Sequence, residues 1–280
     1  MKRILPLAIV ACALAAGGCD AAVKRVPARG RVRVAAAADL NAALADLIAR
    51  FTATRDVDVS VAYGSSGTFY AQLLSRAPFD LFLSADVAYP KRLAERGLTV
   101  PGSAFTYAIG RLVVWAPAAS SVDVEQAGLR SLASRSVAHV AIANPEHAPY
   151  GRAAVAAMQQ AGLYDEVRSK LVFGENVGQA LQFVQSGAAD AGIVALSLAL
   201  APAVKGRGKW SEIPLETYPR IEQGGVILQW AADVGAARAF RAFMLSDDGR
   251  AVLERYGFFL PGSSTGPTRP TRPTGPTRPN

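Results

Sequence analysis

The chain has 280 residues, 51% of them hydrophobic, and a formal net charge of +8. The positive charge is concentrated at the two ends, because residues 34–260 hold 20 basic and 21 acidic side chains. A nearly neutral body excludes nucleic acid as the expected partner, since such binding needs a basic surface on the folded part. Roughly 230 residues remain for the body, enough to bury one large core or two modest ones.

The N-terminal residues have the order of a secretory signal. Lys2 and Arg3 precede an apolar run over residues 4–16, and small residues follow. The run has 13 residues, whereas a membrane-spanning helix needs about 20. We therefore predict a signal peptide over residues 1–19 and an exported protein.

Cys19 follows two glycines, and this order resembles a bacterial lipoprotein cleavage site. Two outcomes stay open. Either the exported protein is anchored by a lipid on Cys19, or ordinary cleavage near Ala21 removes the cysteine with the signal. With a single cysteine left after Cys12 is removed, an intramolecular disulfide is excluded.

The body opens with alternating strand and helix patterns. Arg and Val alternate over 31–37, which predicts a strand, and leucines at helical spacing predict a helix over 40–52. A second alternating strand covers 57–63. The turn GSSGT at 64–68 leads into a helix that ends near Leu74, and 79–83 is a short buried strand. This βαβαβ order predicts a parallel sheet covered by helices.

A similar order returns 110 residues later. A strand over 171–173, a helix over 177–186 and a strand over 193–195 follow one another, with Asp190 placed as Asp80 is in the first unit. The repetition predicts two lobes built alike.

Strand-like segments at 112–115 and 226–230 are expected to cross between the lobes. Helices over 236–245 and 247–256, the second ended by Gly257, are expected to complete lobe one. We therefore predict an α/β protein with lobe one over 31–110 plus 225–260 and lobe two over 111–224. Residues 261–280 repeat Pro, Thr, Arg and Gly and are expected to be disordered.

Four strand-to-helix turns carry small or polar residues where a helix begins: Ala38-Asp39, Ser65-Ser66-Gly67, Pro149-Tyr150-Gly151 and Asn176-Val177. The first N–H groups of a helix lack an intrahelical acceptor and carry partial positive charge. Several such ends that converge can hold an anion without any cation. Ser66 and Tyr150 each add a hydroxyl donor. Taken singly, each turn is also explained as an ordinary helix cap.

Six stretches, in order, resemble the molybdate-binding proteins of bacterial ABC importers. They are VAAAADLNAAL (34–44), YGSSGTFYAQL (63–73), APFDLFLSAD (77–86), ANPEHAPYGRAA (143–154), GENVGQAL (174–181) and RYGF (255–258). The resemblance spans residues 31–260 and implies a type II periplasmic-binding-protein fold. It implies an exported, monomeric protein that captures molybdate or tungstate between two lobes and delivers it to a membrane permease, with no cofactor. Another oxyanion, such as phosphate or sulfate, is the alternative ligand.

Carried over by position, the resemblance implies that five residues contact the oxyanion and none contacts the metal atom directly: Ala38, Asp39, Ser66, Tyr150 and Val177, the last through its backbone N–H. Asp39 departs from the serine or asparagine of many relatives. A carboxylate facing an anion costs roughly 4 kcal/mol for one unit pair at about 4 Å. We expect the Asp39 side chain to turn away and cap the N–H of Asn41 or Ala42. The alternative is that Asp39 accepts a proton from a protonated oxyanion such as hydrogen phosphate.

Enzymatic function is not expected. His139 and His147 are the only histidines in the sequence, and they form no Cys/His cluster suited to zinc. Ser66 has no base near it in sequence, and GSSGT differs from the G-x-S-x-G elbow. A cleft enzyme that uses Ser66 or His147 is the remote alternative. His139 is expected in the core or at a strand edge, and His147 on the surface or, alternatively, at the cleft mouth. Asp86 is expected to cap a helix over 87–96.

Overall fold

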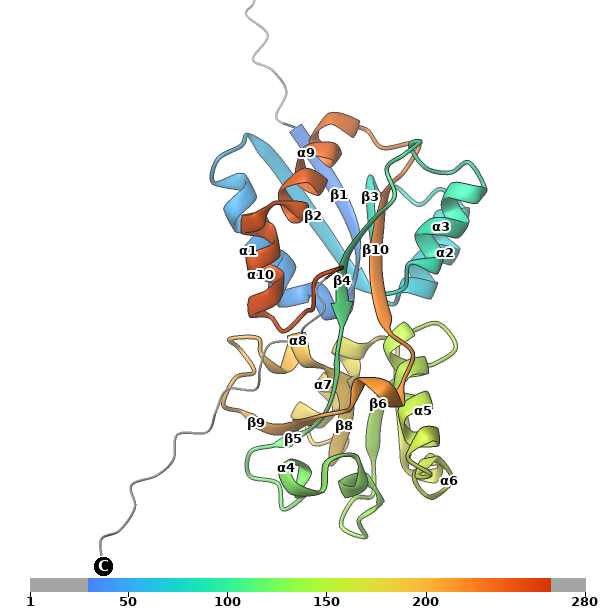
Figure 1. Cartoon of the computed structure of the whole chain (residues 1–280), viewed down its shortest axis with the longest axis vertical. Coiled ribbons are helices and arrows are strands. Elements are labelled where there is room, and N and C mark those ends of the chain that lie inside the picture. Colours follow the sequence, from blue (N-terminus) through green and yellow to red (C-terminus); the bar gives the residue numbers. More distant parts are fainter. Residues whose placement is uncertain (1–29, 263–280) are drawn as a thin grey trace, which may run out of the picture.

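The computed structural model describes residues 30–262, which form two lobes, each built on a five-stranded sheet (Figure 1). The predicted signal peptide with Cys19, and residues 263–280 of the predicted tail, lie outside the described residues.

The first lobe has the strand order β2-β1-β3-β10-β4. The strands are β1 (Gly30–Ala37), β2 (Val57–Gly64), β3 (Leu81–Ser84), β4 (Phe105–Gly110) and β10 (Ile221–Ile227). Strand β1 pairs in parallel with β2 and β3, which confirms the parallel βαβαβ unit, whereas β10 runs antiparallel to β3 and β4.

Helices cover both faces of this sheet. On one side lie α1 (Asn41–Thr52), α9 (Val234–Leu245) and α10 (Asp247–Arg255), and on the other α2 (Ser66–Leu74) and α3 (Ala88–Glu95) (Figure 1). Successive side chains of β1 point to opposite faces of the sheet, so they contact different helix layers. Val32 and Val34 pack with α1 and α9, while Ala35 packs with the helices of the opposite face.

The second lobe has the order β7-β6-β8-β5-β9. Its strands are β5 (Leu112–Pro117), β6 (Val140–Ala143), β7 (Leu171–Gly174), β8 (Ala191–Ala195) and β9 (Gly208–Glu212). Its helices are α4 (Val124–Ala127), α5 (Pro149–Gln160), α6 (Tyr164–Val167), α7 (Val177–Gln185) and α8 (Leu196–Ala199). Short 3-10 turns complete the chain: η1 (Ala38–Leu40), η2 (Gly128–Ala133), η3 (Arg168–Lys170) and η4 (Leu215–Thr217).

The predicted internal repetition is visible in both sheets. In each, the second strand in the order, β1 or β6, pairs in parallel with both neighbours, and antiparallel pairs complete the sheet. Asp80 and Asp190 occupy matching places immediately before β3 and β8. Asp80 accepts a hydrogen bond from the Arg33 N–H at 2.7 Å, and Asp190 accepts one from the Ala138 N–H at 2.7 Å. Both carboxylates therefore tie a strand start to its neighbour.

The chain crosses between the lobes twice, and not at the segments predicted to cross. The first crossing is at Arg111, between β4 and β5, and the second covers residues 213–220, between β9 and β10. Residues 112–115 pair with β8 and β9, and Val226 pairs with Phe82 of β3. The predicted crossings were wrong because these apolar segments are buried inside the sheets, and more polar residues carry the chain across.

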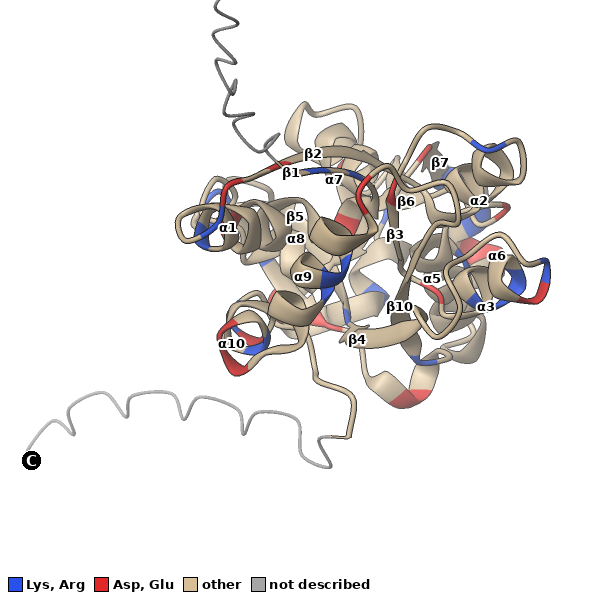
Figure 2. Cartoon of the chain, turned by 90° about the horizontal axis from the view of Figure 1, so that it is seen from above, with Lys and Arg blue, Asp and Glu red and all other residues tan. Residues whose placement is uncertain are grey.

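The closing helices match the prediction: α9 and α10 pack on the first sheet, and Gly257 ends α10 with a φ of +80°. Basic and acidic residues are interspersed over the described body (Figure 2). Within residues 30–262, no helix combines the length and apolar character needed to cross a bilayer.

Candidate anion-binding site

A small cavity lies between the lobes where the four predicted turns meet. Its volume is about 10 Å³, and its walls are Ala37, Ala38, Asp39, Gly64, Ser65, Ser66, Ala85, Ala148, Pro149, Tyr150, Asn176 and Val177. All five residues predicted to contact an oxyanion are among them. None of the lining residues is Lys, Arg or His, so any anion held there meets uncharged donors.

In the second and fourth turns, one residue caps the helix and the next faces the cavity. The Ser65 hydroxyl accepts from the Thr68 N–H at 3.2 Å, and the Asn176 side chain accepts from the Gly178 N–H at 2.9 Å. Ser66 and Val177 are the first residues of α2 and α7, so their N–H groups have no intrahelical acceptor. These N–H groups are available to a ligand.

The Ser66 side chain is fully buried, and its hydroxyl oxygen accepts from the Ala85 N–H at 2.9 Å. Because that bond uses a lone pair, the hydroxyl hydrogen can still donate to an anion. Ala85 follows β3, and the bond therefore fixes the Ser66 hydroxyl against the end of the first sheet.

The third turn places Tyr150 beside Asp39. Tyr150 is the second residue of α5, directly after Pro149, and it is buried. Its hydroxyl donates to Asp39 Oδ2 at 2.9 Å, and this hydrogen bond joins lobe two to lobe one. The phenol that was expected to serve an oxyanion thus already has an acceptor.

The expectation that the Asp39 side chain caps Asn41 or Ala42 was wrong. The start of α1 has no side-chain cap, and the Asn41 N–H instead bonds to the Ala38 carbonyl within η1. The 3-10 turn thereby satisfies a donor that the carboxylate was expected to cap. The Asp39 side chain is 1% exposed and lines the cavity.

Gln223 is a member of the site that sequence reasoning missed. It lies on β10, is fully buried, and its Nε2 lies 2.5 Å from Asp39 Oδ2 and 3.1 Å from the Tyr150 hydroxyl. The available signal was a glutamine that follows Glu222 and precedes two glycines in a strand that otherwise holds apolar residues, since a buried polar side chain needs a partner. Ser197, also missed, donates to the Asp39 carbonyl at 2.7 Å.

Burial dominates the electrostatics of the site. It raises the pKa of Asp39 to about 6, although hydrogen bonds from Gln223, from Tyr150 and from the Asp39 backbone act in the opposite direction. Burial and the nearby Asp39 charge also raise the pKa of Tyr107 and of Tyr150 well above the usual value. Both phenols are therefore neutral donors near neutral pH.

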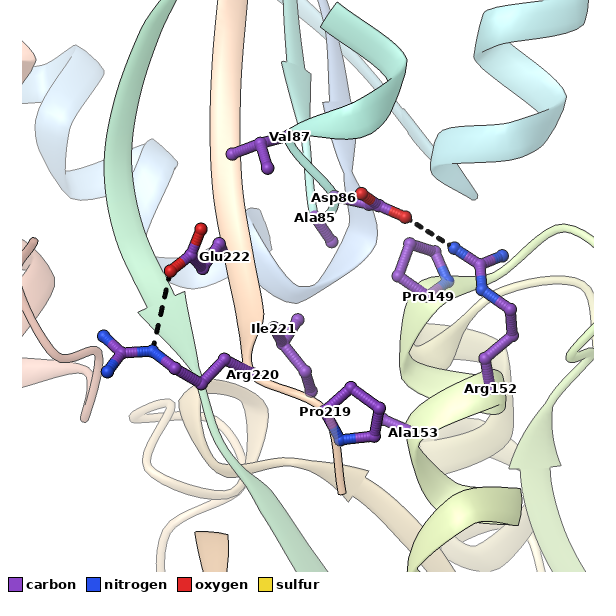
Figure 3. Close-up of a pocket in the computed structure, with 10 residues that line it drawn as sticks. All are labelled: Ala85, Asp86, Val87, Pro149, Arg152, Ala153, Pro219, Arg220, Ile221 and Glu222. Atoms are coloured by element: carbon purple, nitrogen blue, oxygen red, sulfur yellow. Dashed lines mark hydrogen bonds and ion pairs between the residues drawn. The ribbon is translucent and has the colours of Figure 1, made fainter. Parts of the chain in front are cut away.

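A wider hollow of about 360 Å³ adjoins the cavity at the cleft mouth, since Ala85 and Pro149 line both (Figure 3). Arg152 of α5 crosses it to Asp86, with Nη2 and Oδ2 2.7 Å apart. The other oxygen of Asp86 accepts from the Ala88 N–H at 2.9 Å, so the carboxylate binds the start of α3, although the N-cap residue is Val87 and not Asp86 as predicted. The Asp86 side chain therefore joins the start of α3 in lobe one to Arg152 in lobe two.

The two histidines lie outside the cavity wall. His147 is half-buried, and its carbonyl accepts from the Gly67 N–H at 2.9 Å, so it lies at the lobe interface and not on the open surface. His139 is exposed at the edge of β6, where its N–H bonds to Asp190 at 2.9 Å. Among residues 30–262, no group of three or more His, Cys, Asp or Glu is placed to hold a metal ion.

Two α/β lobes that close on a small cavity lined by neutral donors define a solute-binding clamp. Residues 32–259 match the model of the family described as bacterial extracellular solute-binding protein. The chain belongs to this family and, within it, to the group of the molybdate-binding proteins, as the sequence resemblance indicated.

The relatives support this assignment. The molybdate-binding protein ModA of Rhodobacter capsulatus is 38% identical over 231 residues, covering 82% of this chain and 89% of the relative. ModA of Azotobacter vinelandii is 38% identical over 229 residues, covering 82% and 90%. The solved Azotobacter vinelandii periplasmic molybdate-binding protein aligns with a TM-score of 0.77 at 36% identity, covering 82% of this chain and 99% of that one. The predicted type II periplasmic-binding-protein fold is confirmed.

Proposed function

We propose that this protein captures molybdate or tungstate outside the cytoplasm and delivers it to the permease of an ABC importer. The convergence of the starts of α2, α5 and α7 and of the 3-10 turn η1 on one cavity between the lobes carries the proposal. Such helix starts present N–H groups and partial positive charge to an anion. The relatives named as molybdate-binding proteins support the choice among oxyanions.

The ligand contacts we propose are Ala38, Asp39, Ser66, Tyr150 and Val177, all of which line the cavity. Ser66 offers a hydroxyl hydrogen and Val177 a backbone N–H. A tetrahedral oxyanion has four oxygens that accept hydrogen bonds in different directions, which suits donors arriving from both lobes. The anion's oxygens, not its metal atom, meet the protein.

Binding and release are the whole of the proposed activity, without catalysis. The Ser66 oxygen accepts from the Ala85 N–H, and His147 contributes its carbonyl to the lobe contact. Neither arrangement resembles a nucleophile held by a base. We further propose that the exported protein acts as a monomer, which light scattering of the purified protein tests. Mass spectrometry of the membrane fraction tests for a lipid on Cys19.

Isothermal titration of the purified protein with molybdate, tungstate, sulfate and phosphate tests the ligand. We expect one molybdate or tungstate per chain and a higher melting temperature, since a ligand at about 100 times its Kd stabilises the native state by about 2.7 kcal/mol. The buried carboxylate of Asp39 makes phosphate the informative competitor. A clear preference for phosphate would change the ligand assignment, and binding of only an amino acid or a sugar would refute it.

A further inference from the structure

Two buried acceptor atoms in the site have no hydrogen-bond partner. They are Asp39 Oδ1 and Gln223 Oε1. The neighbouring Asp39 Oδ2 accepts from both the Tyr150 hydroxyl and Gln223 Nε2. Buried polar atoms are nearly always paired, so the unpaired oxygen of the cavity-lining Asp39 indicates a place where a hydrogen is missing.

The groups that face Asp39 do not neutralise its charge. Tyr150 approaches from α5, Gln223 from β10 and Ser197 from α8, and Tyr107 of β4 lies close enough for the Asp39 charge to raise its pKa. All four side chains are uncharged.

The turn before α7 adds an acid near the same cavity, not a base. The Glu175 carboxylate accepts from the Ser65 N–H at 3.5 Å and from the Asn176 side chain at 2.5 Å. Within the described residues, no Lys, Arg or His is among the groups that shift the pKa of Asp39. An ionised Asp39 would therefore share a cavity without lining cations with a doubly charged anion, which both burial and like-charge repulsion oppose.

We propose that Asp39 takes up one proton from solvent when the oxyanion is captured, so that Oδ1 becomes a hydrogen-bond donor of the closed site. The inference rests on the proposed function. Protonation turns the unpaired Oδ1 of Asp39 from an acceptor into a neutral donor. It also removes the repulsion between the carboxylate and the ligand. The raised pKa of about 6 in the ligand-free site supports it, since a dianion beside the carboxyl raises that value further.

The arrangement also gives Tyr150 and Gln223 positioning roles. Both donate to Oδ2, which fixes the carboxyl group and leaves Oδ1 as the oxygen that carries the proton. Tyr150 thus positions Asp39 in addition to lining the cavity proposed to hold the ligand.

Proton uptake is measured by isothermal titration with molybdate at pH 7.5 in buffers of different ionisation enthalpy. We expect the wild-type protein to take up close to one proton per molybdate, and its affinity to fall by up to tenfold per pH unit between about pH 6.5 and 8.5. Asp39→Asn should bind molybdate with no proton uptake and with an affinity independent of pH, because asparagine imitates the neutral acid. Asp39→Ser, which also cannot titrate here, provides a second variant. Asp165→Asn, which removes a carboxylate that is 96% exposed, is the matched control and should retain the uptake.

The results separate the two proposals. Tight molybdate binding by the wild type without proton uptake, or uptake that persists in both Asp39 variants, would overturn this inference and leave the proposed function standing. A folded wild-type protein that binds neither molybdate nor tungstate at any pH would overturn the proposed function, and this inference with it.

Discussion

Gly67 is the position where one added methyl group should prevent the lobes from closing. It is the second residue of α2 in lobe one, and its N–H donates to the His147 carbonyl of lobe two at 2.9 Å. A Cβ at this position would lie 2.5 Å from the His147 oxygen and 2.9 Å from its Cα. Ordinary contacts of a Cβ begin near 3.4 Å, so Gly67→Ala requires the two main chains to separate.

The needed separation is about 1 Å, the difference between that ordinary contact and the 2.5 Å that the closed lobes would impose. Such a shift breaks the hydrogen bond between Gly67 and His147, worth about 0.5–1.5 kcal/mol. It also moves Tyr150, three residues after His147, away from Asp39. Since about 1.4 kcal/mol corresponds to a factor of ten in affinity, we expect molybdate binding to weaken at least tenfold.

The same substitution should leave each lobe folded, because separating the lobes relieves the clash and alanine is favoured over glycine within a helix by about 0.5–1 kcal/mol. Titration calorimetry gives the affinity, and thermal unfolding without ligand gives the stability. Gly235→Ala is the matched control, since Gly235 is likewise the second residue of a helix and its Cβ would approach nothing closer than Asp233 at 3.3 Å. Wild-type affinity in Gly67→Ala would refute the idea that the bound state contains this contact.

Three further predictions follow from the site and its support. Ser66→Ala and Tyr150→Phe should each weaken molybdate binding about tenfold or more, since a hydrogen bond involving a charged group contributes about 1.5–3 kcal/mol; unchanged titrations in both would show that these residues serve only structure. Arg152→Gln should release molybdate faster in stopped-flow displacement, because it removes the ion pair across the cleft mouth; an unchanged rate would contradict that role. Asp80 has a lowered pKa despite its burial, because of hydrogen bonds and attraction from Arg33. Its stabilising contribution should be complete above about pH 4 and lost as the pH falls, and acid unfolding of Asp80→Asn should lack this component.

Most helices and strands were predictable because their signals are local. The alternation that defines β1 and the helical spacing of leucines in α1 each arise within a few residues. The crossings were harder to place. An apolar run such as that from Leu112 shows that a strand is buried, but it does not show whether the strand lies within a sheet or links two sheets, so the predicted crossings fell on strands beside the true links.

The candidate site was predictable where it depends on helix starts, and not where it depends on distant partners. Ser66 and Val177 follow from cap and turn patterns next to them. The orientation of Asp39 is decided by Tyr150 and Gln223, which lie 111 and 184 residues away along the chain. A local rule favours a cap for such an aspartate, but tertiary contacts and the 3-10 turn override it. No repeating sequence pattern identifies Gln223 as a partner of Asp39.

The placement of the two residues that hold the Asp39 carboxylate links closure to charge. Asp39 and Gln223 both belong to the first lobe, so the bond between them does not depend on the position of the second lobe. The bond from Tyr150 spans the lobes and exists only while they are together. Opening the cleft therefore removes one donor from the carboxylate and admits water, and both changes alter its pKa, with hydration favouring the ionised form. On the proposed proton uptake, the open protein holds a carboxylate that repels the bound dianion, and the closed protein holds a neutral acid that donates to it. A permease that pulls the lobes apart would then weaken the anion's binding without contacting the anion itself.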